Sequence, residues 1–232
     1  MECIVLAGGL GTRLQGVIGA YPKCMAPVNG KPFLHYVFTY LRSQPCTRVI
    51  LSLGFKHDVI TDWLGTQEWP FDIDFVIEQE PLGTGGGIQL AMQQATGTDV
   101  AILNGDTMFR VALTDMLSFH KRKQAAATIA LKEMQQFDRY GVVLKDAAGC
   151  IISFEEKQYR DAGLINGGIY IVNRKAFFDK QLPEHFSFEK HYLELFVQEK
   201  QFFGFEDKGY FIDIGIPEDY EKAQQDFKEL FR

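Results

Sequence analysis

The sequence predicts an α/β fold: a Rossmann-like, doubly wound and mostly parallel (mixed) sheet in a three-layer α/β/α arrangement. Three observations lead to this prediction. Short runs rich in β-branched residues alternate with helical patterns through the first half of the chain. These runs are apolar on both faces, as in strands that helices cover on both sides. The first run ends abruptly in a glycine-rich turn, at the carboxyl end of a strand, where such sheets hold their ligands.

The first half supplies the parallel part of the sheet. Strands are expected at 4–6, 48–53, 73–77 and 100–103, and helices at 33–41, 58–64 and 86–94. Pro32 precedes the first of these helices, where an opening turn accepts proline. Repeated strand–helix–strand units favour a doubly wound sheet.

After about residue 105 strands and helices no longer alternate regularly, and the second half is predicted to be α+β. We expect a helix at 116–123, a strand at 125–131, a hairpin of 140–144 and 151–154, a strand at 169–172 and a short helix at 174–178. A last helix begins at Pro217 and runs to about 231, with Glu218 and Asp219 in the first turn, where the helix dipole favours acidic residues. Because no linker is visible, we expect one continuous domain over 1–232.

Composition excludes several classes of protein. Lysine and arginine number 24 against 30 aspartates and glutamates, a formal charge of −6. A net acidic chain without a basic cluster is a poor nucleic-acid binder. The four cysteines have no metal-type spacing, and no apolar run is long enough to cross a membrane. We therefore expect a cytoplasmic protein with no membrane or nucleic-acid partner.

The glycine-rich turn is the strongest functional signal. Gly8, Gly9 and Gly11 allow a polyphosphate to approach the backbone closely, and successive N–H groups can point at its oxygens. Arg13 and Lys23 add positive charge to the same segment. The spacing is that of neither a Walker A loop nor a dinucleotide fingerprint. A bare connector is the alternative interpretation, which the two cations disfavour.

This segment resembles the signature of the sugar-1-phosphate nucleotidyltransferases. Residues 8–14 read Gly-Gly-Leu-Gly-Thr-Arg-Leu, and residues 22–28 read Pro-Lys-Cys-Met-Ala-Pro-Val. The resemblance implies a GT-A-like fold and the transfer of a nucleotidyl group from a nucleoside triphosphate to a sugar 1-phosphate, with release of pyrophosphate. It also implies a nucleotide-binding part over 1–110 and a sugar-phosphate-binding part over 111–232, with Arg13, Lys23 and Asp106 as catalytic residues.

Two aspartates are the candidates for a metal site. Asp106 follows a predicted buried strand as Asn-Gly-Asp, and Asp213 is a lone carboxylate among apolar residues beside a glycine. Magnesium prefers one or two carboxylates together with phosphate oxygens and water. The two positions match the metal-binding aspartates of the family, which implies Mg²⁺ as the cofactor. The alternatives are a turn-forming Asp106 and an Asp213 that caps a helix or a turn.

A second glycine-rich segment, residues 78–87, follows a predicted strand and opens a helix. Backbone donors at a helix N-terminus suit close approach of a ligand. The Glu80 carboxylate can accept two N–H bonds from the guanine edge, which favours GTP; the alternative is a solvated loop residue. With the first turn, the resemblance implies nucleotide contacts from Leu6, Ala7, Gly8, Gly9, Gly11, Thr12, Arg13, Lys23, Glu80 and Gly85.

The acceptor side is indicated by three further elements. Residues 154–157 read Phe-Glu-Glu-Lys, residues 140–141 Tyr-Gly and residues 166–170 Asn-Gly-Gly-Ile-Tyr. Without the resemblance, Glu-Glu-Lys after a strand would be a solvated end. With it, the sugar phosphate is expected to contact Gly141, Glu156, Lys157 and Asn166. We assign Phe186, Phe188 and Tyr192 to the core, since aromatic residues are more often core than sugar platforms.

Within the family, the details are most similar to the guanylyltransferases that act on D-glycero-D-manno-heptose 1-phosphate. The resemblance then implies a nucleotide sugar for surface polysaccharide or glycoprotein synthesis. Mannose-1-phosphate guanylyltransferases and N-acetylmuramate-1-phosphate uridylyltransferases stay as alternatives. A catalytically silent nucleotide-sensing module is the alternative from a different class, disfavoured because Lys23, Asp106, Lys157 and Asp213 are all present. The sequence leaves the oligomeric state open, a homo-oligomer included.

Overall fold

A seven-stranded sheet forms the centre of the computed structural model, which describes residues 1–9, 14, 16, 19 and 21–232. Its order is β12-β8-β11-β6-β1-β4-β5. The strands are β1 (Glu2–Leu6), β4 (Arg48–Leu53), β5 (Asp72–Ile77), β6 (Asp99–Asn104), β8 (Ala127–Phe137), β11 (Arg160–Asn173) and β12 (Phe202–Glu206). Within this sheet β11 alone runs antiparallel to both neighbours, so the predicted mostly parallel, mixed sheet is confirmed.

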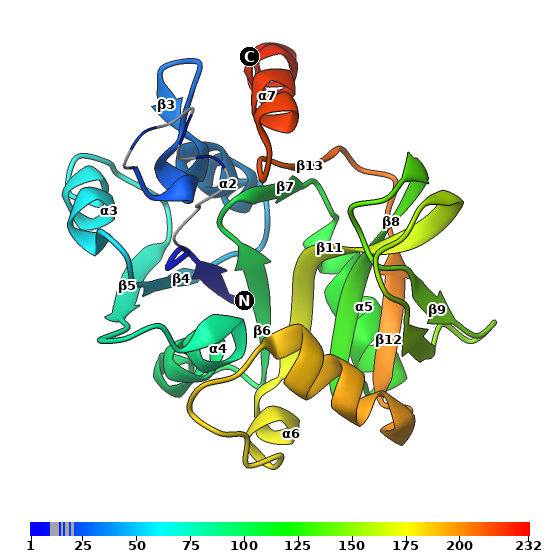
Figure 1. Ribbon diagram of the computed structural model, residues 1–232. Helices are drawn as coiled ribbons and strands as arrows, with labels where there is room; N and C mark the ends of the chain where they lie inside the picture. The colour runs from blue at the N-terminus through cyan, green and yellow to red at the C-terminus, as the bar shows by residue number, and fades with distance from the viewer. Residues whose placement is uncertain (10–13, 15, 17–18, 20) are drawn as a thin grey trace.

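Helices cover both faces of the sheet (Figure 1). Successive side chains of β1 lie on opposite faces of the sheet: Cys3 and Val5 belong to one buried cluster and Ile4 to the other. The first cluster includes side chains of α2 (Phe33–Arg42), α3 (His57–Leu64), α5 (Leu113–Lys123) and α7 (Pro217–Leu230). The second includes those of α4 (Gly83–Gln94), α6 (Arg174–Phe178) and the π-helix η3 (Glu189–Glu194). The predicted three layers are therefore confirmed.

Three short antiparallel strand pairs lie outside the central sheet. The predicted hairpin is formed by β9 (Val143–Lys145) and β10 (Ile151–Phe154). Two further antiparallel pairs were not predicted: β2 (Pro27–Val28) with β3 (Lys31–Pro32), and β7 (Thr107–Phe109) with β13 (Phe211–Asp213). Two short 3-10 helices are η2 (Lys23–Met25) and η4 (Val197–Glu199).

Two predictions about strands were wrong. β5 was expected to be buried on both faces, but Asp72, Asp74 and Phe75 are exposed. The reason is its place at the sheet edge, where it pairs with β4 alone. β11 is much longer than the predicted 169–172, because its polar first half pairs with β8 beyond a register shift between Asn166 and Tyr170.

The order of the strands places a topological switch point between β1 and β6. The chain builds outward from β1 to β4 and β5, and then returns to add β6 on the other side of β1. Ligands of such sheets bind at the carboxyl ends of the strands at this point. The turn after β6 lies against the end of β1, because the Gly105 N–H donates to the Leu6 carbonyl at 2.8 Å. A Cβ at Gly105 would lie 2.6 Å from that oxygen, so the approach requires glycine.

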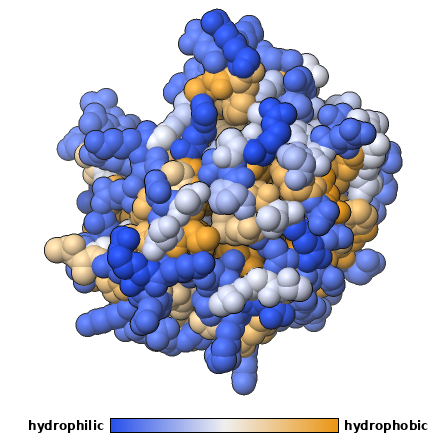
Figure 2. Space-filling model, turned by 180° about the vertical axis from the view of Figure 1, so that it is seen from behind, coloured by the Kyte–Doolittle hydropathy of each residue, from blue (hydrophilic) through white to orange (hydrophobic). Residues whose placement is uncertain are grey.

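The surface agrees with the acidic, polar composition. Figure 2 shows a face that is mostly hydrophilic, interrupted by smaller apolar areas. Among the described residues, the large apolar side chains that are exposed are scattered: Tyr21, Phe75, Leu144, Ile152, Tyr159 and Leu195. None of the helices in the described part of the chain has the length and apolar character needed to span a membrane.

Phe227 is one of the buried side chains by which helix α7 packs on the fold, and its ring contacts those of Phe33 and Tyr36 in α2. We expect Phe227→Ala to lower the free energy of unfolding by about 3–5 kcal/mol, because it leaves a cavity between α7 and α2. The neighbouring exposed Lys228→Ala should change it by less than about 0.5 kcal/mol. Urea denaturation of both variants measures this. An equal effect of the two would contradict this packing role.

Candidate active site

The Lys23 ammonium lies between the carboxylates of Asp106 and Asp213. Its Nζ donates to Asp106 Oδ2 at 2.7 Å and to Asp213 Oδ1 at 3.1 Å. The Lys23 side chain is 14% exposed, and those of Asp106 and Asp213 are 34% and 26% exposed. Three residues far apart in the sequence thus meet at one half-buried point.

Local structure explains why the two aspartates meet. Strand β7 begins directly after Asp106, and β13 ends at Asp213. The two strands pair antiparallel with Asp213 opposite Thr107, which brings Asp213 beside Asp106. The Ile214 N–H also donates to the Asp106 carbonyl at 3.2 Å. Both carboxylates are therefore fixed by backbone pairing.

Lys23 is held by the short helix η2. The other two residues of this helix, Cys24 and Met25, are buried, and the Cys24 thiol donates to the Ala7 carbonyl at 3.9 Å. The buried pair anchors the turn, and Lys23 lies at its start. The end of strand β1 and the helix η2 that carries Lys23 therefore pack together.

The ionisation of these groups depends on their proximity. Burial alone would lower the pKa of Lys23, but the charges of Asp106 and Asp213 outweigh burial and raise it above the ordinary lysine value. Burial raises the pKa of Asp213, and the nearby Asp106 charge raises it further, whereas Lys23 opposes both effects. Lys23 therefore stays protonated, and it makes the ionised form of Asp213 easier to reach.

One side of this junction opens into a cavity of about 590 Å³, here called the glycine-turn cavity. Its lining includes Leu6, Gly8, Gly9, Glu80, Thr84 and Asp106. Glu78 shapes it from the end of β5: its carboxylate accepts from the Ser52 hydroxyl and from the Leu82 N–H, both at 3.1 Å. These bonds fix the turn that leads into α4, so the rim of the cavity is held by the sheet.

Not all predicted nucleotide contacts line this cavity: Lys23 bonds Asp106 but is not itself a lining residue. Gly11, Thr12 and Arg13 lie outside the described residues. Ala7 is buried, and its carbonyl accepts from Cys24. Gly85 is also buried: its N–H donates to the Phe186 carbonyl at 2.9 Å, and a Cβ there would lie 2.1 Å from the Phe186 ring. The structure therefore gives Gly85 a packing role, and its nucleotide contact stays a prediction.

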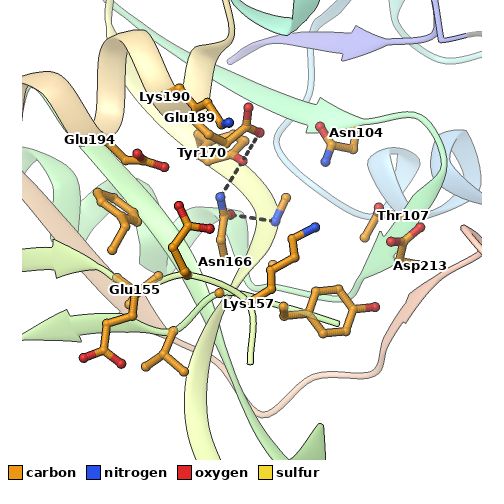
Figure 3. Close-up of a pocket in the computed structure, with 18 of the residues that line it drawn as sticks. Asn104, Thr107, Glu155, Lys157, Asn166, Tyr170, Glu189, Lys190, Glu194 and Asp213 are labelled. Carbon is orange, nitrogen blue, oxygen red and sulfur yellow. Dashed lines mark hydrogen bonds between the residues drawn. The ribbon is translucent and has the colours of Figure 1, made fainter. Parts of the chain in front are cut away.

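The other side of the junction opens into a cavity of about 490 Å³, here called the hairpin cavity. Its lining includes Gly141, Glu156, Lys157, Asn166, Glu189 and Asp213. All of the predicted acceptor-side residues are therefore brought together. Figure 3 shows Lys157 reaching into this space from the loop after β10, on the side where Asp213 and Thr107 lie.

The loop that carries Glu156 and Lys157 is fixed at its base. Its neighbour Glu155 forms an ion pair with Arg160 at the start of β11. A Cβ at Gly141 would lie 2.4 Å from the Glu155 carbonyl, so the backbones touch there and leave no room for a side chain. Glu156 and Lys157 themselves are exposed and available to a ligand.

Sequence reasoning missed Asn104 and Glu189, which line both cavities. Asn104 directly precedes the Gly-Asp pair that was recognised, so its place at the end of β6 was a usable signal. Glu189 follows Phe188 in a segment whose aromatic residues were assigned to the core. That assignment is confirmed: Phe186, Phe188 and Tyr192 are all buried. Aromatic and polar residues alternate at 186–189, and in the structure the aromatic ones are buried and the polar ones half-buried. This alternation is the sequence signal that could have indicated Glu189 as a residue facing a cavity.

The pair of aspartates suits a small divalent cation that also binds phosphate. Within the described ranges, no three or more His, Cys, Asp or Glu side chains form a metal-type cluster. Asp106 and Asp213 nevertheless already share one cation, the Lys23 ammonium. Two carboxylates are the number that Mg²⁺ takes when a substrate phosphate and waters complete its ligands. The donor set therefore fits that metal.

The Lys23 charge should control the titration of Asp213. In Lys23→Met we expect the pKa of the Asp213 carboxyl to rise, because the cation that favours the carboxylate is lost. An NMR titration of ¹³C-labelled aspartate side chains measures this. Lys190→Met is the control, since this lysine lies across the hairpin cavity from Asp213 (Figure 3). A pKa that moves equally in both variants would contradict the direct contact.

Known proteins resemble this chain over nearly its full length. A family model described as nucleotidyl transferase matches residues 2–229. The D-glycero-alpha-D-manno-heptose 1-phosphate guanylyltransferase of Aneurinibacillus thermoaerophilus is 48% identical, over 98% of this chain and 99% of that protein. The enzyme of that name from Campylobacter jejuni is 44% identical, over 95% and 97%.

A solved structure agrees with these relatives. The crystal structure of HddC from Yersinia pseudotuberculosis complexed with GMP-PN superposes with a TM-score of 0.87 at 38% identity, covering 97% of this chain and 99% of that one. The fold, the two cavities whose aspartates share the Lys23 ammonium and these similarities lead to one assignment: the chain belongs to the nucleotidyl transferase family.

Proposed function

We propose that this protein transfers GMP from GTP to D-glycero-α-D-manno-heptose 1-phosphate and releases pyrophosphate. The observation that carries the proposal is the junction itself: Lys23 bonds both Asp106, which lines the cavity of about 590 Å³, and Asp213, which lines the cavity of about 490 Å³. A two-substrate transfer needs two sites that meet at the reacting phosphorus. The full-length similarity to proteins named as heptose 1-phosphate guanylyltransferases supports this choice of substrates.

The nucleotide is assigned to the glycine-turn cavity. Leu6, Gly8 and Gly9 bring backbone close to the triphosphate, and Gly11, Thr12 and Arg13 continue this turn in the sequence. Most of the lining comes from residues before 110, which supports a nucleotide-binding part over 1–110; Glu189 is the contribution from the second half. Glu80 is exposed at the rim and can accept the N–H groups of a guanine edge.

The sugar 1-phosphate is assigned to the hairpin cavity. Lys157 supplies a point charge for the acceptor phosphate, on the side of the cavity nearer Asp213 (Figure 3). Glu156 and Asn166 offer an acceptor and an amide to the hydroxyls of the sugar. Gly141 lines the same cavity and allows its backbone to lie against the Glu155 carbonyl. These residues all lie in the proposed sugar-phosphate part, 111–232.

Asp106 and Asp213 are proposed to hold Mg²⁺. When bound, this ion neutralises triphosphate oxygens and stabilises charge on the leaving pyrophosphate. Lys23, which the two carboxylates keep protonated, stabilises charge at the reacting phosphoryl group from the same junction.

The reaction asks little covalent chemistry of the protein. A phosphate oxygen of the sugar 1-phosphate, already anionic, attacks the α-phosphorus of GTP; the new O–P bond forms as the bond to pyrophosphate breaks. No proton needs to be removed from the nucleophile, so no general base is required. The protein aligns the two phosphates and stabilises the developing charge, and these two effects account for most of the catalysis in phosphoryl transfer.

A substrate panel tests the proposal. Pyrophosphate release is measured with GTP, ATP, UTP and CTP against heptose, mannose and N-acetylmuramic acid 1-phosphates, with and without Mg²⁺. The proposal expects the highest kcat/KM for GTP with the heptose 1-phosphate, and only with the metal. A preference for mannose 1-phosphate or for UTP would instead identify one of the alternative enzymes. No release with any pair would indicate a silent, nucleotide-sensing protein.

Two charge-removing variants test the junction. We expect Lys23→Met and Asp106→Asn each to lower kcat by about a hundredfold or more, because each removes a preorganised charge at the reacting phosphorus. Lys228→Met, on the exposed side of α7, serves as the control and should leave kcat unchanged. Near-normal pyrophosphate release by both junction variants would refute their assignment.

Base recognition by Glu80 has its own test. Replacing Glu80 by Gln removes the negative charge that accepts from N1–H and the 2-amino group of guanine. We expect the kcat/KM for GTP to fall at least about tenfold, with a smaller fall for ITP, which lacks the 2-amino group. Competition between GTP and ITP in one assay measures the ratio. An unchanged GTP-to-ITP ratio would remove Glu80 from base recognition.

A further inference from the structure

Glu189 stands between the two substrate cavities and lines both of them. Its Oε2 accepts from the Thr84 hydroxyl at 3.1 Å and from the Ser187 hydroxyl at 3.3 Å. Its Oε1 accepts from the Tyr170 hydroxyl at 3.4 Å. One carboxylate thus accepts from residues of both cavities: Thr84 lines the glycine-turn cavity, whereas Ser187 and Tyr170 line the hairpin cavity.

On the hairpin-cavity side the contacts fix the Asn166 amide. Its Nδ2 donates to the Tyr170 hydroxyl at 2.8 Å, and its Oδ1 accepts from the Gly168 N–H at 3.0 Å (Figure 3). An amide bonded at both ends has a defined orientation, with one Nδ2 hydrogen left for a ligand. The orientation of a proposed sugar contact therefore depends on Tyr170, and through it on Glu189.

On the other side the contacts fix the turn that lines the glycine-turn cavity. The Phe186 N–H donates to the Leu82 carbonyl at 3.0 Å, and the Gly85 N–H donates back to the Phe186 carbonyl at 2.9 Å. The Phe188 N–H donates to the Thr84 hydroxyl at 2.9 Å. Residues 186–189 are therefore hydrogen-bonded along the first turn of α4. Glu189 adds the last of these bonds, by accepting from the Thr84 hydroxyl.

The network has a defined direction. Tyr170 is buried, and burial, followed by the charge of Glu189, raises the pKa of its hydroxyl, so the proton stays on the tyrosine. The hydroxyl must then donate to Glu189 and accept from Asn166. Hydrogen bonds in such a chain polarise one another, and a change at one end alters the strength of the next bond.

We infer that Glu189 is a positioning residue that couples the two substrate cavities, holding Thr84 of the nucleotide side and Asn166 of the sugar side in one hydrogen-bonded unit. The inference rests on the proposed function. A substrate that orders one side of this unit also orders the other side, so the second substrate binds more tightly. Coupling between binding sites is reciprocal, so the same factor applies whichever substrate binds first. Glu189 does this through Tyr170 and Thr84, without a part in the chemical step.

The chain provides a matched pair of variants to test the coupling. Tyr170→Phe removes the hydroxyl that joins Asn166 to Glu189. Tyr192→Phe is the control: both tyrosine rings are buried and both contact Phe188. Within the described part of the chain, however, the Tyr192 hydroxyl has no hydrogen-bond partner. Each variant removes one buried oxygen from the same aromatic cluster, and only the first one breaks the network.

The measurement is a coupling factor obtained by calorimetry with Mg²⁺ present. Heptose 1-phosphate is titrated into the protein alone and into the protein saturated with α,β-methylene-GTP, whose α–β bridge cannot be cleaved. The ratio of the two Kd values is the coupling factor, which we expect to be about tenfold in the wild type. It should fall to within about twofold of unity in Tyr170→Phe and keep the wild-type value in Tyr192→Phe.

Two further variants change the other residues of the hydrogen-bonded network, Glu189 and Thr84. Glu189→Ala and Thr84→Val should also lower the coupling factor, so the test stands even if one variant fails to fold. A merely structural role would weaken both Kd values together and leave their ratio unchanged.

The outcomes separate this inference from the proposed function. A wild-type factor near unity, or a Tyr170→Phe variant that keeps the wild-type factor, would overturn the coupling while leaving the enzyme assignment intact. A wild-type protein that releases no pyrophosphate with GTP and any sugar 1-phosphate would overturn both.

Discussion

The ion-pair junction of Lys23 with Asp106 and Asp213 is the constraint on which the rest of the structure depends. Two carboxylates that both lie within about 3 Å of one nitrogen repel each other by an energy on the order of a few kcal/mol unless a cation lies between them. Half-burial strengthens this repulsion. The fold meets the constraint with backbone: β7 and β13 pair so that the two acids cannot separate, and η2 brings the lysine to them.

The sheet then decides what surrounds the junction. Its switch point lies between β1 and β6, so the glycine turn and the Asn-Gly-Asp turn leave the sheet side by side. Gly105 permits the contact between them, where its N–H meets the Leu6 carbonyl. The antiparallel strand β11 continues the sheet beyond β6 and carries Asn166 into the second cavity. One edge of one sheet thus supplies both cavities, with the charged junction between them.

Much of this arrangement was predictable because it rests on local signals. The buried runs at 48–53 and 100–103 indicated the parallel strands, and the glycines after the first strand indicated a turn at the ligand-binding edge of the sheet. The pairing of β7 with β13 was not predictable, because strands of three residues carry no periodicity and join positions about a hundred residues apart. Glu189 was missed for a related reason: its partners Thr84 and Tyr170 are distant in sequence, and only the fold brings them together. The exposure of β5 also depends on strand order, which composition does not encode.

The charge at the junction bears on how an acidic protein binds two phosphorylated substrates. The whole chain carries a formal charge of −6, and salt screens charges beyond about 8 Å, so attraction must come from groups inside the cavities. Two carboxylates and one ammonium leave the junction itself with one net negative charge. A triphosphate that approaches it alone therefore meets repulsion, despite the lysine. A divalent cation reverses the sign, which gives an electrostatic reason for the proposed magnesium that is independent of resemblance. The backbone pairing of β7 and β13 holds the two acids together, and Lys23 favours the ionised form of Asp213, so the charge of the junction favours the proposed metal over a free phosphate.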